Sequence, residues 1–315
     1  MIIKKRSPQL NFLGVEALMK RMDSQHHKFK EIENFYFRAK AGVSGKVYVD
    51  QQLDGYVHYE PHLIIQDLHL KSSTFFQIDN LFLTKSYALI IEVKNIRHTV
   101  ELMQDPFYLK QTNPDGAVTI MDSPEDQLDK NITWLNDWLE KRNWNIPVYG
   151  VIVFTNSDSH IIANKCHFDI VRPRYLTNKI RKMPIVPVLL SDEQLSKLGA
   201  DLLKSHSNYR PKTLLHKFKL NPRDIRTGVE CPICFEIGMT RNKRKWVCSN
   251  LHYSEDAHVK VLDEYFLIFG GEITNKEFRR FFHVEGKDVA NRLLKGMNLL
   301  EKGQGRWRTY QKHLY

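Results

Sequence analysis

Long hydrophobic runs are missing from this sequence of 315 residues. Its longest apolar stretches, such as residues 87–93 (YALIIEV), have the length of a β-strand, whereas a membrane-spanning helix needs about 20 apolar residues. The basic N-terminus is not followed by the apolar segment that a secretory signal peptide requires. We therefore expect a cytoplasmic protein with no membrane partner.

Cysteine is scarce as well, with four residues in the chain, three of them close together. In a cytoplasmic protein such a cluster indicates a metal site rather than disulfides. Cys231 and Cys234 have the CxxC spacing that places two thiolates on one side of a Zn²⁺ ion, and Cys248 follows fourteen residues later. His252 is our first candidate for the fourth ligand and His258 the second. The pattern predicts a small structural zinc ribbon, and the alternative is a buried group of free cysteines.

The net charge of +11 is concentrated in the last third of the chain. Residues 1–205 have 26 Lys and Arg against 24 Asp and Glu, whereas residues 206–315 have 21 against 12. Because clustered Lys and Arg neutralise phosphate groups, this asymmetry predicts a C-terminal region that binds a polyanion. The alternative is a basic surface that only keeps the protein soluble.

Composition and hydrophobic patterning divide the chain into four segments: residues 1–205, 206–226, 227–260 and 261–315. The signals in the first segment are helices at 7–40, at 43–54 and from Ser123, and strands at 62–70, 75–84, 87–95, 148–156 and 185–190. This order predicts an α/β domain with helices on both faces of its sheet. The second segment is a basic, proline-marked linker or accessory helix, and the third contains the clustered cysteines.

The last segment, residues 261–315, has the order helix, turn, helix and β-wing that is typical of a winged helix-turn-helix. Thr274 and Glu277 have capping-box spacing and mark the start of one helix. The candidate nucleic-acid contacts are Lys287, Asn291, Arg292 and Lys295 on the following helix, and Arg306 and Arg308 in the wing. A winged helix that binds protein is the alternative, but the basic charge favours DNA.

Two carboxylates and a lysine lie on neighbouring strand signals. Asp79 is in the second strand (FQIDNLFL) and Glu92 in the third (IIEVKN), with a short turn between the strands. In an antiparallel pair these carboxylates can meet at one end of the sheet, where oxygen ligands suit Mg²⁺ or Mn²⁺. Lys94 shares the strand face of Glu92 and can orient a water molecule or stabilise charge on a phosphate, and Gln77 adds a polar neighbour to Asp79. The alternative is a solvated Glu–Lys ion pair.

With these residues, the stretch 36–156 resembles the nuclease-related domain (NERD), a branch of the PD-(D/E)XK superfamily, and its N-terminal lead-in resembles bacterial members. The residues that carry the resemblance are 38–42 (RAKAG) with Gly45, 66–68 (QDL), 76–79 (FQID), 91–95 (IEVKN) and Gln127. The resemblance implies a restriction-endonuclease-like mixed sheet flanked by helices. It also implies a metal-dependent phosphodiesterase site with Asp79, Glu92 and Lys94 as its core.

One residue departs from the family pattern. Family members usually carry Glu directly after the second glycine of the GxxG motif, on the helix before the sheet, whereas this chain has Lys46 there. Since that carboxylate commonly assists metal binding, its loss bears on activity or on a second metal. Glu60 or Asp67 could compensate, although Asp67 also suits a strand-end hydrogen-bonding role. Lys46 could equally contact a phosphate.

The sequence therefore predicts a DNA nuclease that depends on Mg²⁺ or Mn²⁺, whose basic C-terminal modules hold DNA. Defence against foreign DNA and DNA processing are the roles that analogy within the family suggests. The first alternative is a DNA-binding regulatory protein with an inactive nuclease-like domain, and the second is an RNA nuclease. A homo-oligomer or an activating protein partner is compatible with each of these functions.

Overall fold

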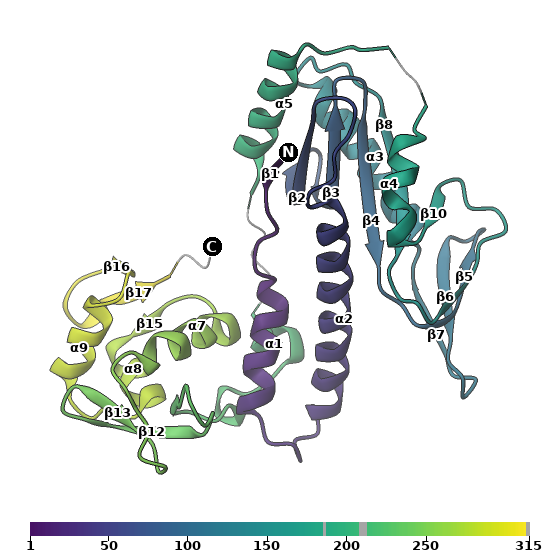
Figure 1. The fold of residues 1–315 in the computed structure, drawn as a ribbon. Helices are drawn as coiled ribbons and strands as arrows, with labels where there is room; N and C mark the ends of the chain where they lie inside the picture. Colours follow the sequence, from purple (N-terminus) through teal and green to yellow (C-terminus); the bar gives the residue numbers. More distant parts are fainter. Residues whose placement is uncertain (185–186, 208–212, 313–315) are drawn as a thin grey trace. The chain divides into compact units, whose positions relative to one another are not determined.

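The computed structural model describes residues 1–184, 187–207 and 213–312 (Figure 1). The chain forms two compact units. Unit 1 consists of Met1–Ser7 and Lys40–Tyr209, and unit 2 of Pro8–Ala39 and Arg210–Tyr315. The structure thus groups residues 8–39 with the C-terminal segments, whereas the sequence predicted them as part of a domain over 1–205. The reason is hydrophobic: the apolar faces of these helical residues belong to the core of unit 2.

Unit 1 is built on a mixed sheet of six strands in the order β1-β2-β3-β4-β8-β10. The strands are β1 (Ile2–Lys4), β2 (His62–Lys71), β3 (Phe75–Thr84), β4 (Ala88–Lys94), β8 (Val148–Phe154) and β10 (Asp169–Val171). β2, β3 and β4 pair in antiparallel fashion, whereas β1 runs parallel to β2, and β4, β8 and β10 run parallel to one another. The mixed α/β architecture predicted for this part of the chain is confirmed.

Helices cover both faces of this sheet (Figure 1). One core joins the sheet to α3 (Pro124–Glu140) and α5 (Asp192–Ser205). The other joins it to α4 (Pro173–Arg181) and to the C-terminal part of α2 (Phe29–Leu53). The strands are apolar on both sides because both faces are buried.

Several elements of unit 1 differ from the sequence prediction. A second sheet, in the order β7-β6-β5-β9, was not predicted. Its strands are β5 (His98–Met103), β6 (Tyr108–Thr112), β7 (Val118–Asp122) and β9 (Ser159–Ile162). The predicted division into helices at 7–40 and 43–54 is wrong: α2 runs unbroken through Gly42, and the break lies earlier, between Arg21 and Phe29. Of the strand predicted at 185–190, the described residues 187–190 form no strand.

Unit 2 has one hydrophobic core shared by all its segments. Its helices are α1 (Leu10–Arg21), the N-terminal part of α2, α6 (Leu214–Phe218), α7 (Ala257–Phe269), α8 (Asn275–Phe282) and α9 (Lys287–Lys295), with a 3₁₀ turn η1 at Pro222–Asp224. The predicted linker 206–226 is in part an accessory helix, α6, whose Leu214 and Phe218 are buried in this core.

Two small sheets complete unit 2. The first consists of β11 (Val229–Glu230), β12 (Ile237–Asn242), β13 (Lys245–Val247) and β14 (Tyr253–Ser254) in sequential order. The second has the order β15-β17-β16, with β15 (Ile273–Thr274), β16 (Leu300–Lys302) and β17 (Thr309–Gln311), and a 3₁₀ turn η2 at Gly305–Trp307. From α7 onward the order is therefore helix, strand, helix, helix, strand, strand. Among the residues that the structure describes, no helix is long and apolar enough to cross a membrane.

Candidate active site and metal cluster

Asp79 and Glu92 come together through the antiparallel pairing of β3 and β4. Asn80 pairs with Ile91, and one step further along this register Asp79 lies opposite Glu92. The Val93 N–H donates to Asp79 Oδ2 at 3.1 Å, so the Asp79 carboxylate lies against the segment that carries Glu92 and Lys94. The two carboxylates thus lie at the same end of the strand pair, the end away from the turn that connects β3 and β4.

Glu92 is almost completely buried, at 1% exposure, and within the described part of the chain only its Oε1 has a partner. Lys94 Nζ lies 2.9 Å from Glu92 Oε1 and donates to Gln127 Oε1 at 2.7 Å. Glu92 Oε2 is buried with no hydrogen-bond partner among the described residues. Burial raises the pKa of Glu92 to about 7, with a further contribution from the Asp79 charge, and Lys94 opposes this shift. The site therefore contains a carboxylate oxygen that is available to a ligand.

Lys46, on α2, forms an ion pair with Asp79. Its Nζ lies 2.6 Å from Asp79 Oδ1, and the Asp79 side chain is 6% exposed. Burial alone would raise the pKa of Asp79, but the charges of Lys46 and Arg6 outweigh it and hold the pKa below its usual value. The residue that departs from the family pattern is thus in direct contact with a candidate metal ligand.

The close approach of α2 to the sheet depends on Gly45. A Cβ atom at this position would lie 2.7 Å from Thr155 Oγ1 and 2.8 Å from Asn95 Cβ. Asn95 also donates from Nδ2 to the Ala41 carbonyl at 2.7 Å, which ties the helix to the residue that follows Lys94. This packing holds Lys46, the next residue of the helix, over the end of β3.

Arg6 and Asp50 join the same polar cluster, and the sequence did not predict them. Arg6 donates from Nε to Asp50 Oδ2 at 2.7 Å and from Nη2 to Asp50 Oδ1 at 3.0 Å. It also donates from Nη2 to the backbone oxygen of Asp79 at 3.0 Å. Because Arg6 is 44 residues from Asp50 and 73 from Asp79 in the sequence, no local pattern indicates these contacts.

Gln77, predicted as a neighbour of Asp79, contacts a different carboxylate. Its Nε2 donates to Asp67 Oδ1 at 2.6 Å, and His69 Nε2 lies 3.1 Å from the same oxygen. Burial opposes ionisation of Asp67, but hydrogen bonds and charge from His69, with the bond from Gln77, lower its pKa well below the usual range. Asp67 has a positive φ of 55°, which interrupts the regular course of β2.

Glu60, the other acidic residue considered as a substitute for the missing carboxylate, lies at the opposite end of β2. The pairing of His62 with Thr84 places the start of β2 five residues along β3 from Asp79. At about 3.3 Å per residue the separation is on the order of 20 Å. The idea that Glu60 compensates for the change at position 46 is therefore wrong.

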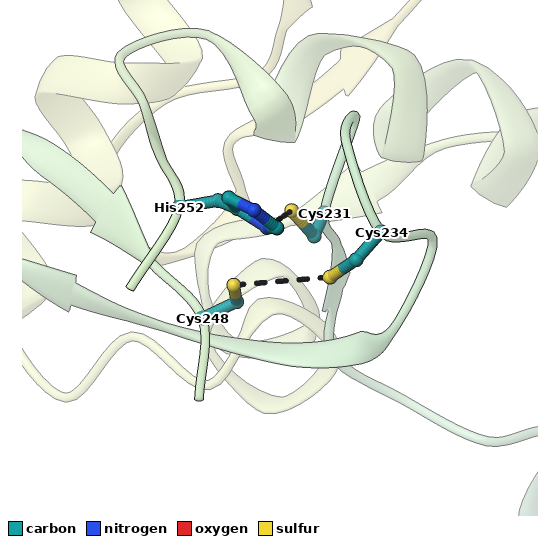
Figure 2. A group of neighbouring side chains, drawn as sticks. All are labelled: Cys231, Cys234, Cys248 and His252. Atoms are coloured by element: carbon teal, nitrogen blue, oxygen red, sulfur yellow. Dashed lines mark hydrogen bonds between the residues drawn. The ribbon is translucent and has the colours of Figure 1, made fainter. Parts of the chain in front are cut away.

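In unit 2, the four predicted zinc ligands converge (Figure 2). Ligand atoms of Cys231, Cys234, Cys248 and His252 all lie within 4.8 Å of one another, so this group could hold a metal ion. The left-handed residues Phe235 and Leu251 (φ 61° and 60°) turn the two loops that present these side chains. His258, the second candidate, accepts a hydrogen bond from Trp246 Nε1 at 3.1 Å instead.

The predicted nucleic-acid contacts lie mainly on α9. Lys287, Arg292 and Lys295 are exposed, whereas Asn291 accepts a hydrogen bond from Asn275 at 2.7 Å. Arg308 Nε lies 3.5 Å from Glu301, and the side chain of Arg306 is outside the described part of the chain.

A further basic group, which the sequence did not single out, lies on the hairpin of β12 and β13. It contains Arg241, Lys243, Arg244 and Lys245, of which the last three are exposed. Burial lowers the pKa of Arg241, and the charge of Arg292 on α9 lowers it further. The run RNKRK is the signal by which this group could have been found.

Comparison with known families finds a match to part of the chain. Residues 41–155 match the model of the nuclease-related domain (NERD). Searches of curated proteins and of solved structures find no match. The matched stretch contains Lys46, Asp79, Glu92, Lys94 and Gln127, and it ends within unit 1. Most of unit 1 is thus similar to the nuclease-related domain, whereas unit 2 lies outside the matched residues.

Proposed function

We propose that unit 1 is a nuclease that hydrolyses phosphodiester bonds of DNA with the help of a divalent cation. The observation that carries this proposal is the bond from Val93 N to Asp79 Oδ2, which holds Asp79 against the Glu92–Lys94 segment. The match of residues 41–155 to the nuclease-related domain supports the same reaction class.

The donor set suits one Mg²⁺ or Mn²⁺ ion, held by Asp79 and Glu92. Both cations prefer carboxylate oxygens, and Glu92 Oε2, which is buried and has no hydrogen-bond partner among the residues described, is an oxygen of this kind. When bound, the cation would polarise the scissile phosphate and lower the pKa of the attacking water.

The other polar residues near the site neutralise charge on the phosphate or hold the residues that do so. Lys94 is oriented by Glu92 and Gln127, so its ammonium is available to stabilise negative charge on the phosphate in the transition state. Gln127 acts through Lys94. Gln77 acts further away by holding Asp67.

Unit 2 holds the DNA in this proposal. The Cys₃His cluster binds a structural Zn²⁺. Its four N and S ligands complete the tetrahedral coordination of the ion and leave no open position for a substrate. The elements from α7 to β17 form a winged helix in which α9 enters the major groove and Lys287, Arg292 and Lys295 contact DNA. Arg306 and Arg308 act from the wing on the phosphate backbone.

A second function is a DNA-binding regulatory protein whose nuclease-like site does not cut. The observation in its favour is the ion pair of Lys46 with Asp79, which engages a candidate metal ligand. Cleavage by the purified protein distinguishes the two functions.

The test compares wild type with Glu92→Gln and Lys94→Met on supercoiled, linear and single-stranded DNA and on RNA, with Mg²⁺, Mn²⁺ or EDTA. We expect metal-dependent cleavage of DNA that falls by about 10²–10³ in each variant, the usual cost of removing one group that stabilises the transition state. Lys130→Met is the control, since Lys130 is exposed on α3 and pairs with Asp126. If the wild type shifts DNA in a gel but never cuts it, the regulatory function replaces the nuclease.

A further inference from the structure

The reaction proposed above assigns no role to Lys46, although its ammonium group contacts a candidate metal ligand. We propose that its ammonium group is a tethered cation that competes with the divalent metal for Asp79, so that Lys46 sets the metal concentration at which the site fills. This inference rests on the proposed metal site of Asp79 and Glu92, and it concerns how strongly that site binds metal.

The first argument is the occupancy of the Asp79 oxygens. Oδ1 is 2.6 Å from Lys46 Nζ, and Oδ2 accepts the Val93 N–H. A metal ion at Asp79 must therefore share Oδ2 with the Val93 N–H while the ammonium stays on the same carboxylate, share Oδ1 with the ammonium, or displace the ammonium. Since the Asp79 side chain is 6% exposed, water cannot readily replace either partner. Removing one partner of a buried ion pair is costly, because the charge of the other partner is left buried and uncompensated.

The second argument is the charge balance of the cluster. The cations Arg6, Lys46 and Lys94 all act on Asp79. Arg6 is held by both oxygens of Asp50, and Lys94 by Glu92. Lys46 therefore leaves the pair Asp79 and Glu92 without the excess of negative charge on which divalent-cation affinity depends. With an uncharged residue at position 46 the cluster gains one negative charge, and with Glu it gains two.

The third argument is that the helix itself is held in place. Gly45 packs against Asn95 and Thr155, and Asn95 is hydrogen-bonded to the Ala41 carbonyl. A shift of α2 is therefore a costly way to remove Lys46 from Asp79. The Lys46 side chain is 21% exposed, so rotation of this side chain toward solvent is the cheaper way to release Asp79.

The test measures Mn²⁺ binding to the full-length protein without nucleic acid, by electron paramagnetic resonance of free Mn²⁺. The variants are Lys46→Met, which removes the charge at similar length, and Lys46→Glu. We expect Mn²⁺ to bind about tenfold or more tightly to Lys46→Met than to wild type, and more tightly still to Lys46→Glu. Adding Glu92→Gln to either variant abolishes the gain. Lys46→Arg keeps the charge and binds as weakly as wild type.

Thermal unfolding supplies a readout that does not depend on activity. Without metal, Lys46→Met unfolds at a lower temperature than wild type, because Asp79 is left buried and unpaired, and Mn²⁺ restores more stability to the variant than to wild type. Lys85→Met serves as the control: Lys85 pairs with the exposed Asp192, and its loss changes neither measurement.

Two results would contradict the inference in different ways. Equal Mn²⁺ affinity of wild type, Lys46→Met and Lys46→Glu, all lost with Glu92→Gln, overturns the competition but keeps the metal site. Failure of all folded variants to bind Mn²⁺ removes the metal site itself, and with it the metal-dependent reaction proposed above.

Discussion

The basic side chains around Asp79 all have a positive charge, but each one has a different partner, and the partner determines its role at the site. Lys94 is held between Glu92 and Gln127, which orients it, whereas Lys46 is held by Asp79. Arg6 is held by Asp50 and supports the backbone of Asp79. At the scale of the residue, the role of each cation in the site therefore depends on the carboxylate with which it pairs.

Gly45 packs so closely on the sheet that the addition of one methyl group would disturb this arrangement. We expect Gly45→Ala to destabilise the protein by about 1–3 kcal/mol, because the new Cβ would overlap Thr155 and Asn95 and force α2 away from the sheet. Gly42→Ala is the matched control on the same helix. No atom of the described residues lies within 4 Å of a Cβ at position 42, so the better helix propensity of Ala should stabilise the protein by up to about 1 kcal/mol. Urea unfolding followed by circular dichroism measures both, and destabilisation of the same size at both positions would contradict the packing argument.

At the scale of the element, α1 is held to the rest of unit 2 by a buried ion pair as well as by apolar contacts. Arg21, at the end of α1, donates to Glu264 on α7 at 2.8 and 3.0 Å, and its side chain is fully buried. It also donates to the carbonyls of Arg226 and Gly228. One guanidinium thus joins α1, α7 and the segment that leads into β11.

Removing this guanidinium should be strongly destabilising. We expect Arg21→Met to cost about 3–5 kcal/mol, because Glu264 is left buried and uncompensated, and a second change, Glu264→Leu, to recover part of the loss. The exposed pair of Lys30 and Glu33 is the comparison, and Lys30→Met should cost less than about 1 kcal/mol. Chemical denaturation of the variants tests this, and similar costs for Arg21→Met and Lys30→Met would rule out a structural role for the buried pair.

At the scale of the whole molecule, two units with separate cores predict two responses to metal removal. The Cys₃His cluster belongs only to unit 2, where its loops adjoin β11 and β13. The candidate cation site belongs only to unit 1. Reagents that remove zinc should therefore act on unit 2 without loosening the six-stranded sheet.

Hydrogen exchange measured by mass spectrometry checks this separation. A strong zinc chelator, or Cys234→Ser, should speed exchange in β11–β14 and α7 by about tenfold or more, while β3, β4 and β8 keep their protection. Cys166→Ser is the control, because Cys166 lies in unit 1 outside the cluster. Unchanged exchange in unit 2 after chelation would show that the cluster holds no structural metal.

Local spacing alone predicted several features of the protein. The ExK spacing places Glu92 and Lys94 on one strand, and CxxC brings Cys231 and Cys234 onto one loop, because these relations depend only on strand and turn geometry. The alternatives for the fourth cysteine-cluster ligand stayed open in the sequence, since residues 252 and 258 are both close enough along the chain. The structure places His252 beside the three cysteines, whereas His258 accepts a hydrogen bond from Trp246.

Tertiary structure alone decided the remaining features. The contacts of Lys46 with Asp79 and of Arg6 with Asp50 join residues 33 and 44 positions apart, and the grouping of residues 8–39 with unit 2 joins still more distant segments. Periodicity in a sequence reports which face of an element is apolar, but not which other element covers that face. Which cation lies on Asp79 follows from how α2 packs on the sheet, and this packing depends on long-range contacts that no short window of the sequence contains.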